Sequence, residues 1–206
     1  MNCKDSRPVA GTFLAVALLF AGCMKETGET VVLPVRAFKV PEYVLSAAER
    51  AVIEEWMPIN EGDRPPAVEG CYLASPLRLL YSSDGLEPEF HDLAFCLGVA
   101  NGRGRTTYRH RQGVVEGTGL EASIVGSGDR FTLWVVEQAA SASSGWDYET
   151  LTILSGRKTQ RGIADCRLAV IMRLRRADCL GALAREGTWR VFADGDGLAQ
   201  KTEEWQ

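Results

Sequence analysis

The chain has 206 residues, of which 46% are hydrophobic and 24% charged, and it carries a net charge of −4 at pH 7. This length and hydrophobic content suit one domain with a substantial core. The net negative charge argues against a nucleic-acid-binding protein, because such proteins need a basic surface to meet phosphates.

A short charged N-terminus precedes an apolar run that ends at a cysteine. Lys4 and Arg7 lie before the apolar residues 11–20, and two small residues then lead to Cys23. The run is too short to span a membrane, which takes about 20 apolar residues. The segment resembles the signal peptide of a bacterial lipoprotein, in which this cysteine is lipidated and becomes the first residue of the mature chain.

The resemblance implies that residues 1–22 are removed and that acyl chains on Cys23 hold the protein permanently to a membrane. In lipoproteins of bacteria with two membranes, Asp after the cysteine favours the inner membrane. Met24 occupies that position here, which implies the outer membrane of the bacterial cell envelope. The alternative is an ordinary secretory signal cleaved nearby, with Cys23 a free or paired thiol.

Residues 23–42 are interpreted as a tether, and a helix is predicted over about 46–57. Ser46 followed by Glu49 forms a capping-box pattern, and Pro58 ends the helix. A helix of this length is marginal alone, so it must pack on the rest of the domain. The predicted packing face consists of apolar residues at helical spacing: Leu45, Ala48, Val52 and Trp56.

The rest of the chain reads as strands, beginning at about residue 71. Short apolar runs separated by Gly, Asp or Ser occupy 77–82, 93–100, 104–111, 114–125, 130–137, 148–154, 166–175 and 189–193. Alternation is clearest in the seventh run, where Leu168, Val170, Met172 and Leu174 face one way and Arg167, Arg173 and Arg175 face the other. The predicted fold is mainly β: an antiparallel β-sandwich or barrel of about eight or more strands, in a single domain over 43–206 with one N-terminal packing helix.

Four cysteines remain once Cys3 leaves with the signal and Cys23 is lipidated. An even number in an exported chain predicts disulfides, with three possible connectivities. Two candidates flank a predicted strand, whose ends lie too far apart for a direct bond. We therefore expect long-range pairs that link the first two cysteines to the last two; buried unpaired thiols are the alternative. The candidates are Cys71, Cys96, Cys166 and Cys179.

Four arginines share odd positions: Arg103, Arg105, Arg109 and Arg111. On one strand they would project from one face, with Tyr108 and His110 on the other. A turn at 112–113 would place Arg109 opposite Glu116 and leave the other three arginines without an acid on that strand. Such a ladder predicts binding of an anionic glycan, a phosphate or a lipid headgroup, because guanidinium donates bidentately. The alternative is a solvated face paired from the other neighbouring strand.

Two further patterns are interpreted as structural. The sequence Asp-Gly-Asp-Gly at 194–197 begins like a calcium loop but lacks the later ligands, so we predict a turn after the last core strand. His91 and Cys96 have opposite parity and would face opposite sides of one strand, so His91 is expected to be structural. No metal site, cofactor or catalytic set is predicted, because only His91 and His110 could support zinc.

The leading functional hypothesis is a non-enzymatic binding or envelope-structural module on a lipid-anchored exported protein. The alternatives are a secreted hydrolase whose site is assembled from distant residues, and an accessory subunit of an envelope complex. A cleft with paired carboxylates, or with Cys and His, would favour the enzyme. A hollow barrel with an apolar mouth would favour a small ligand, and a flat exposed patch would favour a protein partner.

Overall fold

The computed structural model describes residues 39–87, 89–141, 143 and 145–203. Cys23 and the signal sequence lie outside these residues. The described residues form one helix, α1 (Ala47–Glu54), and a single eleven-stranded sheet. Its strands are β1 (Asp63–Arg64), β2 (Gly70–Ala74), β3 (Leu77–Ser82), β4 (Leu93–Leu97), β5 (Tyr108–Gln112), β6 (Val115–Ser127), β7 (Arg130–Ser141), β8 (Trp146–Lys158), β9 (Gly162–Asp178), β10 (Trp189–Asp194) and β11 (Leu198–Thr202).

The predicted mainly β class with one packing helix is confirmed. Each predicted apolar run overlaps one of the strands β3 to β10, whereas β1 and β11 were not expected. All the strand pairs are antiparallel except the short parallel pair of β1 with β6. None of the helical structure in the described ranges has the length and hydrophobicity that crossing a bilayer requires.

The sheet curls until β11, at one end of the strand order, meets β9. Its strand order is β11-β2-β4-β5-β6-β7-β8-β9-β10-β3, and β11 also pairs with β9. The edge of β9 is therefore divided, because Gly162–Ala164 pairs with β11 and Arg167–Ile171 pairs with β10. Asp165 lies between the two pairings with a positive φ of 54°, at a break in the register with β8. Such bulges bend a strand and re-aim its partners.

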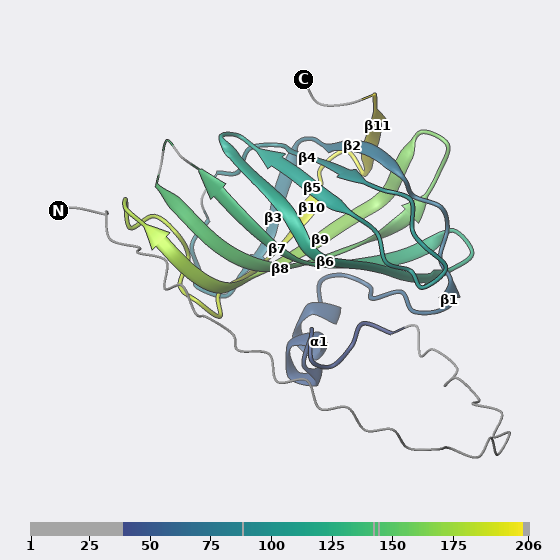
Figure 1. The fold of residues 1–206 in the computed structure, drawn as a ribbon, viewed down its shortest axis with the longest axis horizontal. Coiled ribbons are helices and arrows are strands. Elements are labelled where there is room, and N and C mark those ends of the chain that lie inside the picture. Colours follow the sequence, from purple (N-terminus) through teal and green to yellow (C-terminus); the bar gives the residue numbers. More distant parts are fainter. Residues whose placement is uncertain (1–38, 88, 142, 144, 204–206) are drawn as a thin grey trace, which may run out of the picture. The chain divides into compact units, whose positions relative to one another are not determined.

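Two hydrophobic clusters pack on opposite faces of the sheet. The first lies inside the curl and includes Tyr72, Phe95, Phe131 and Leu133. The second packs helix α1 against the outer face. Figure 1 shows the helix below the long strands β6 to β9, while β2, β4 and β5 curl above them. Packing extends to Val40, which is buried in the second cluster, so the predicted tether ends slightly earlier than residue 42.

The N-terminal capping box of α1 is confirmed, and so is the packing of Leu45 and Trp56, but the middle of the predicted packed face was wrong. Ser46 accepts the N–H of Glu49, whose carboxylate accepts the N–H of Ser46. Ala48 and Val52, expected on the packed face, are exposed, and Ile53 is buried in their place. The helix is rotated because the Glu49 side chain is drawn toward a basic group on the sheet.

That group is one of two arginines on the outer face of β9, which hold the two ends of the helix. Arg173 donates to Oε1 of Glu49 at 2.7 Å and to the carbonyl of Val44 at 2.9 Å. Arg167 donates to the carbonyl of Trp56, just beyond the helix. Guanidinium groups here satisfy carbonyls and a carboxylate that the protein would otherwise bury without partners.

The disulfide prediction was wrong in its connectivity. Cys71 and Cys96 form a disulfide with each other, across the neighbouring strands β2 and β4, where their Cα atoms are 4.0 Å apart. Direct cross-strand partners satisfy the distance limit without any long-range link. Cys166 is a buried thiol on β9 and Cys179 lies at the surface just after that strand, so the two do lie at separate places along it.

Replacing Arg173 by Gln is expected to lower the stability of the protein by about 1 kcal/mol near neutral pH. Partial burial alone would raise the pKa of Glu49, but the hydrogen bonds from Arg173 and Ser46 outweigh it and lower that pKa. The stabilisation is therefore present above the unfolded-state pKa of Glu49 and is lost as the pH falls through its lower folded-state value.

Urea unfolding of parent and variant at a series of pH values checks this. The stability difference should shrink as the pH falls through the lowered folded-state pKa of Glu49, where the carboxylate becomes protonated. Arg64→Gln is the matched control, because it removes an exposed arginine from the short strand β1. A difference that stays constant from neutral to acid pH would mean that the ion pair with Glu49 contributes nothing.

Candidate functional site

A buried carboxylate lies inside the curled sheet, where most other side chains are apolar. Glu137 of β7 is 2% exposed. Its Oε2 lies 2.8 Å from Nδ1 of His110 on β5. Its Oε1 accepts hydrogen bonds from the hydroxyls of Thr150, at 3.1 Å, and of Thr152 on β8. Three strands thus converge on one carboxylate, and these contacts meet the rule that a buried charge must be hydrogen-bonded.

Two glycines of β6 make room for this contact. His110 and Glu137 lie on β5 and β7, so the imidazole must cross the strand between them. At the crossing point stands Gly117, the cross-strand partner of His110. A Cβ at Gly117 would come within 2.6 Å of Nδ1 of His110, and one at Gly119 would crowd Tyr108. Glycine in a strand interior often marks such a close approach.

A cavity of about 60 Å³ adjoins the carboxylate. Tyr108, His110, Tyr148 and Phe192 are among its lining residues, together with Leu77, Leu93, Gln112, Glu137, Thr150, Thr152, Leu168 and Val170. Gln112, Tyr148 and Val170 are only half-buried, so the cavity lies close to the surface on that side. The site thus combines a small hollow, apolar walls and a few convergent polar groups, which is the usual composition of a ligand pocket.

The electrostatics of the cavity keep its hydroxyl groups neutral. Burial raises the pKa of Tyr148 to about 12, and the negative charge of Glu137 adds to the effect. Burial and the same carboxylate raise the pKa of Tyr108 well above its usual value. The described residues that line the cavity include no Lys or Arg. Glu137 is therefore the source of negative charge here, and no lysine or arginine side chain among these residues attracts an anion.

The structure separates the four arginines that the sequence placed on one strand. Arg109 and Arg111 lie on β5, but Arg103 lies in a turn, and Arg105 makes only an isolated bridge and an ion pair with Glu121 at 3.1 Å. The turn forms because Asn101 Oδ1 accepts the N–H groups of Arg103 and Arg105. The four-membered ladder is thus wrong.

The register of the β5–β6 hairpin also differs from the prediction. Its turn is at Gly113 and Val114, where Gly113 has a φ of +60°, so Arg111 faces Glu116 and Arg109 faces Thr118. Binding of an anionic partner stays a prediction, now resting on Arg109 and Arg111. Tyr108 and His110 point the other way, into the interior, as expected.

The remaining predicted residues take structural positions. His91 is exposed just before β4, and its backbone carbonyl accepts a hydrogen bond from Gln112. Cys96 is bonded to Cys71, so it cannot act as a nucleophile beside His91. Asp194 and the three residues after it form the predicted turn, although β11 follows it.

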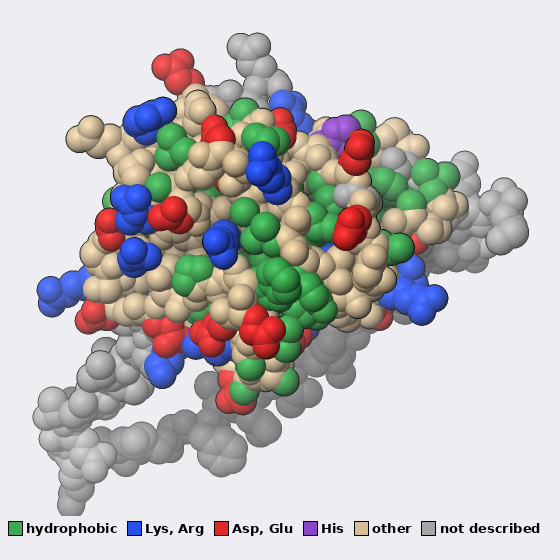
Figure 2. Space-filling view, turned by 180° about the vertical axis from the view of Figure 1, so that it is seen from behind, with side chains coloured by type: hydrophobic (Ala, Val, Ile, Leu, Met, Phe, Trp, Pro, Cys, Tyr) green, Lys and Arg blue, Asp and Glu red, His purple; other side chains and the backbone are tan. Residues whose placement is uncertain are grey.

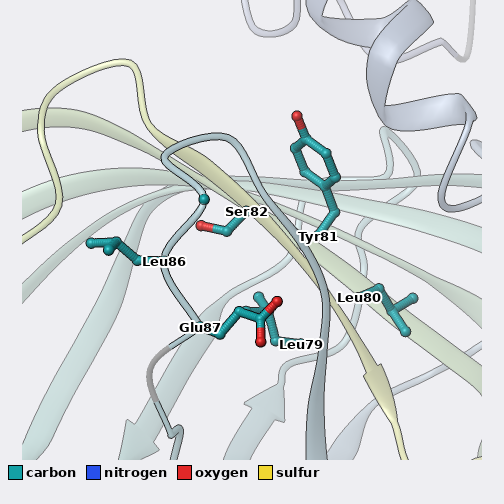
Figure 3. A pocket seen from close by; sticks show the side chains of 7 residues that line it. Leu79, Leu80, Tyr81, Ser82, Leu86 and Glu87 are labelled. Atoms are coloured by element: carbon teal, nitrogen blue, oxygen red, sulfur yellow. The ribbon is translucent and has the colours of Figure 1, made fainter.

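The described surface also has larger hollows, and one of about 310 Å³ gathers polar side chains that include Asp63, Arg64 and Asn101. Another, of about 340 Å³, lies between β3 and the chain after it. Figure 3 shows its side chains diverging: Leu80 points away, and Tyr81 points toward helix α1. On that side Tyr81 stacks between Trp56 and Trp189, at centroid distances of 4.9 and 4.5 Å. Figure 2 shows basic and acidic side chains interspersed around a central hydrophobic group, without a field of one sign.

Comparisons with protein families, with curated proteins and with solved structures find no match for this chain.

The alternation of residues along β7 would have indicated from the sequence that Glu137 is buried. Phe131, Leu133 and Val135 alternate along β7 and fill the interior, and Glu137 continues the same alternation. An acid in step with core residues must point inward. Its partner His110 could not be identified in this way, because the pairing of β5, β6 and β7 depends on the hairpin registers.

Gly117→Ala is expected to destabilise the protein by about 1–3 kcal/mol, because the new methyl group would overlap the imidazole of His110 and force it away from Glu137. Gly102→Ala is the control, since nothing lies within 4 Å of a Cβ at Gly102 and its φ is not positive. Thermal unfolding of both variants checks the prediction. Equal melting temperatures would show that the imidazole does not need the space above Gly117.

Proposed function

We propose that this chain is a lipid-anchored protein of the bacterial cell envelope whose β domain binds a small ligand without transforming it. The observation that carries the binding role is the cavity inside the curled sheet, where a buried carboxylate and the surrounding hydroxyl and imidazole groups adjoin an otherwise apolar interior. Such networks seldom add stability over a well-packed apolar core, so their presence beside a cavity favours a role in recognition.

Neither the buried thiol of Cys166 nor the Cys71–Cys96 disulfide supports a thiol-based enzyme. Burial raises the pKa of Cys166 to about 12, and the negative charge of Asp194 contributes to the shift. A thiol with that pKa stays protonated and unreactive at neutral pH. Cys71 and Cys96 are joined in a disulfide. A non-catalytic binding role therefore accounts for the cavity better than covalent catalysis by cysteine does.

One observation favours a hydrolase as the second candidate. His110 and Glu137 come from separate strands and form a hydrogen-bonded imidazole–carboxylate pair at 2.8 Å. Such a pair can orient an imidazole to take a proton from water. The cavity would then hold both the attacking water and the bond to be cleaved, which its volume of about 60 Å³ barely admits.

The proposed attachment to the membrane rests on Cys23 and the apolar run before it. Replacing Cys23 by Ser should release the protein from the membrane fraction, because the acyl chains would have no attachment point. Fractionation of bacteria that express parent or variant checks this. A variant that stays in the detergent-extracted fraction as firmly as the parent would rule out Cys23 as the anchor.

The hydrolase alternative is tested on the mature chain carrying Cys23→Ser, with chromogenic esters, glycosides and phosphate esters. We expect no turnover above the buffer rate. Turnover that disappears in both His110→Gln and Glu137→Gln, but persists in the surface control Arg64→Gln, would establish the enzyme in place of the binding module. Turnover that all three variants retain would indicate a contaminating enzyme.

A further inference from the structure

We propose that the cavity beside Glu137 takes a small cationic amine, either free or as the ammonium end of a longer molecule. The inference rests on the proposed binding function and names the class of ligand for that same cavity. Three properties of the described lining residues point to it: the sign of the charge, the polarity of the hydrogen-bonding groups and the size of the hollow.

The charge at the cavity favours a cation. Glu137 is 2% exposed, and no Lys or Arg is among the described residues that line the hollow. A buried carboxylate without an arginine or lysine beside it attracts positive charge strongly, because the surroundings screen it poorly. His110 is the one lining group that could supply positive charge. The same carboxylate opposes an anion, as it opposes ionisation of Tyr108 and Tyr148.

The hydrogen-bonding groups favour a donor. The Glu137 carboxylate can only accept a hydrogen bond, so Nδ1 of His110 is the donor and carries the imidazole proton. In neutral imidazole, Nε2 then presents a lone pair. None of the described residues forms a hydrogen bond with Nε2 of His110 or with the hydroxyls of Tyr108 and Tyr148. These three atoms belong to residues that line the cavity, and each can accept from an ammonium group.

The size of the hollow limits the group to a few heavy atoms. A volume of about 60 Å³ is several times the roughly 10–15 Å³ that one water molecule needs in such a cavity. An ammonium or methylammonium group fits this space. The aromatic rings of Tyr108, Tyr148 and Phe192 line it, and aromatic walls favour a desolvated cation. A longer ligand would extend past the half-exposed Gln112, Tyr148 and Val170.

The test uses three probes of nearly equal size on the mature chain carrying Cys23→Ser: methylammonium, methanol and acetate. The chain has two histidines, His91 and His110. Selective ¹⁵N labelling of histidine therefore gives one reporter inside the cavity and one at the exposed surface. We expect methylammonium to shift the His110 signals with saturation in the millimolar range, while His91 stays unchanged. Methanol should act at least tenfold more weakly, and acetate should have no effect.

Two variants connect the binding to the cavity. Glu137→Gln keeps the shape of the side chain and removes its charge, so the affinity for methylammonium should fall at least tenfold. If that variant does not fold, Tyr148→Phe takes its place, because it removes a hydroxyl from a half-exposed lining residue, and a several-fold loss is expected. Arg64→Gln is the control and should bind like the parent. Unchanged binding in a folded Glu137→Gln or in Tyr148→Phe overturns the proposal.

The outcomes separate the ligand class from the binding function. Saturable binding of acetate or methanol in preference to methylammonium would overturn the amine and leave the cavity as a binding site. Equal shifts of His91 and His110 would indicate a general solvent effect and overturn the proposal. A His110 signal that none of the probes moves would overturn both the amine and the cavity, and would make the Glu137 network structural.

Discussion

Asp194 accepts hydrogen bonds from three backbone N–H groups, and these bonds hold two segments that change direction at the same place. The donors are Ser75 at 3.0 Å, Asp196 at 3.1 Å and Leu198 at 3.2 Å. Ser75 lies between β2 and β3, Asp196 lies between β10 and β11, and Leu198 is the first residue of β11. Burial raises the pKa of Asp194, and the neighbouring Asp196 carboxylate raises it further. The residue remains in place because its oxygens meet N–H groups that would otherwise lack partners.

The two bends, between β2 and β3 and between β10 and β11, determine where the interior of the curled sheet is closed and where its cavity lies. Before the bend β2 pairs with β11, and after it β3 pairs with β10. Beyond the bend, β3 and β10 therefore form a separate pair that does not continue the β2–β11 pair. Asp92 supports the arrangement by accepting the hydroxyl of Ser75 and the N–H of Leu77. Leu77, the first residue of β3, and Leu93, the first residue of β4, both line the cavity.

Much of the architecture follows from patterns that are local in sequence. The strands β3 and β10 and the capping box at Ser46 could be predicted, because alternation and capping depend on neighbours within a few residues. The orientation of α1 could not, since it depends on Arg173, which is distant in the chain. The disulfide was missed for the same reason, because it depends on β2 and β4 being direct neighbours.

The candidate site illustrates the boundary between local and long-range information. The alternation of each strand predicted that His110 faces away from the arginines, and it could have shown that Glu137 points inward. Their meeting could not be predicted, because it needs two hairpin registers and a glycine between them. A shift of one residue, such as that between the expected and observed β5–β6 turns, changes every cross-strand partner. The arginine ladder failed because Asn101 starts a turn that takes Arg103 and Arg105 off the strand.

The hydrogen bonds by which Arg173 and Arg167 hold the two ends of helix α1 also affect how the domain responds to a pulling force. The chain enters the domain through Val40 and Val44, which are buried, and the carbonyl of Val44 is held by Arg173. Tension applied from the N-terminal side therefore meets β9 before it can unwind the helix. In the described sheet β9 is the longest strand and is paired with β8, β10 and β11, so tension arriving there is shared across several ladders of hydrogen bonds. The segment that leads into the domain is thus held by the strand with the most pairing partners in the described sheet.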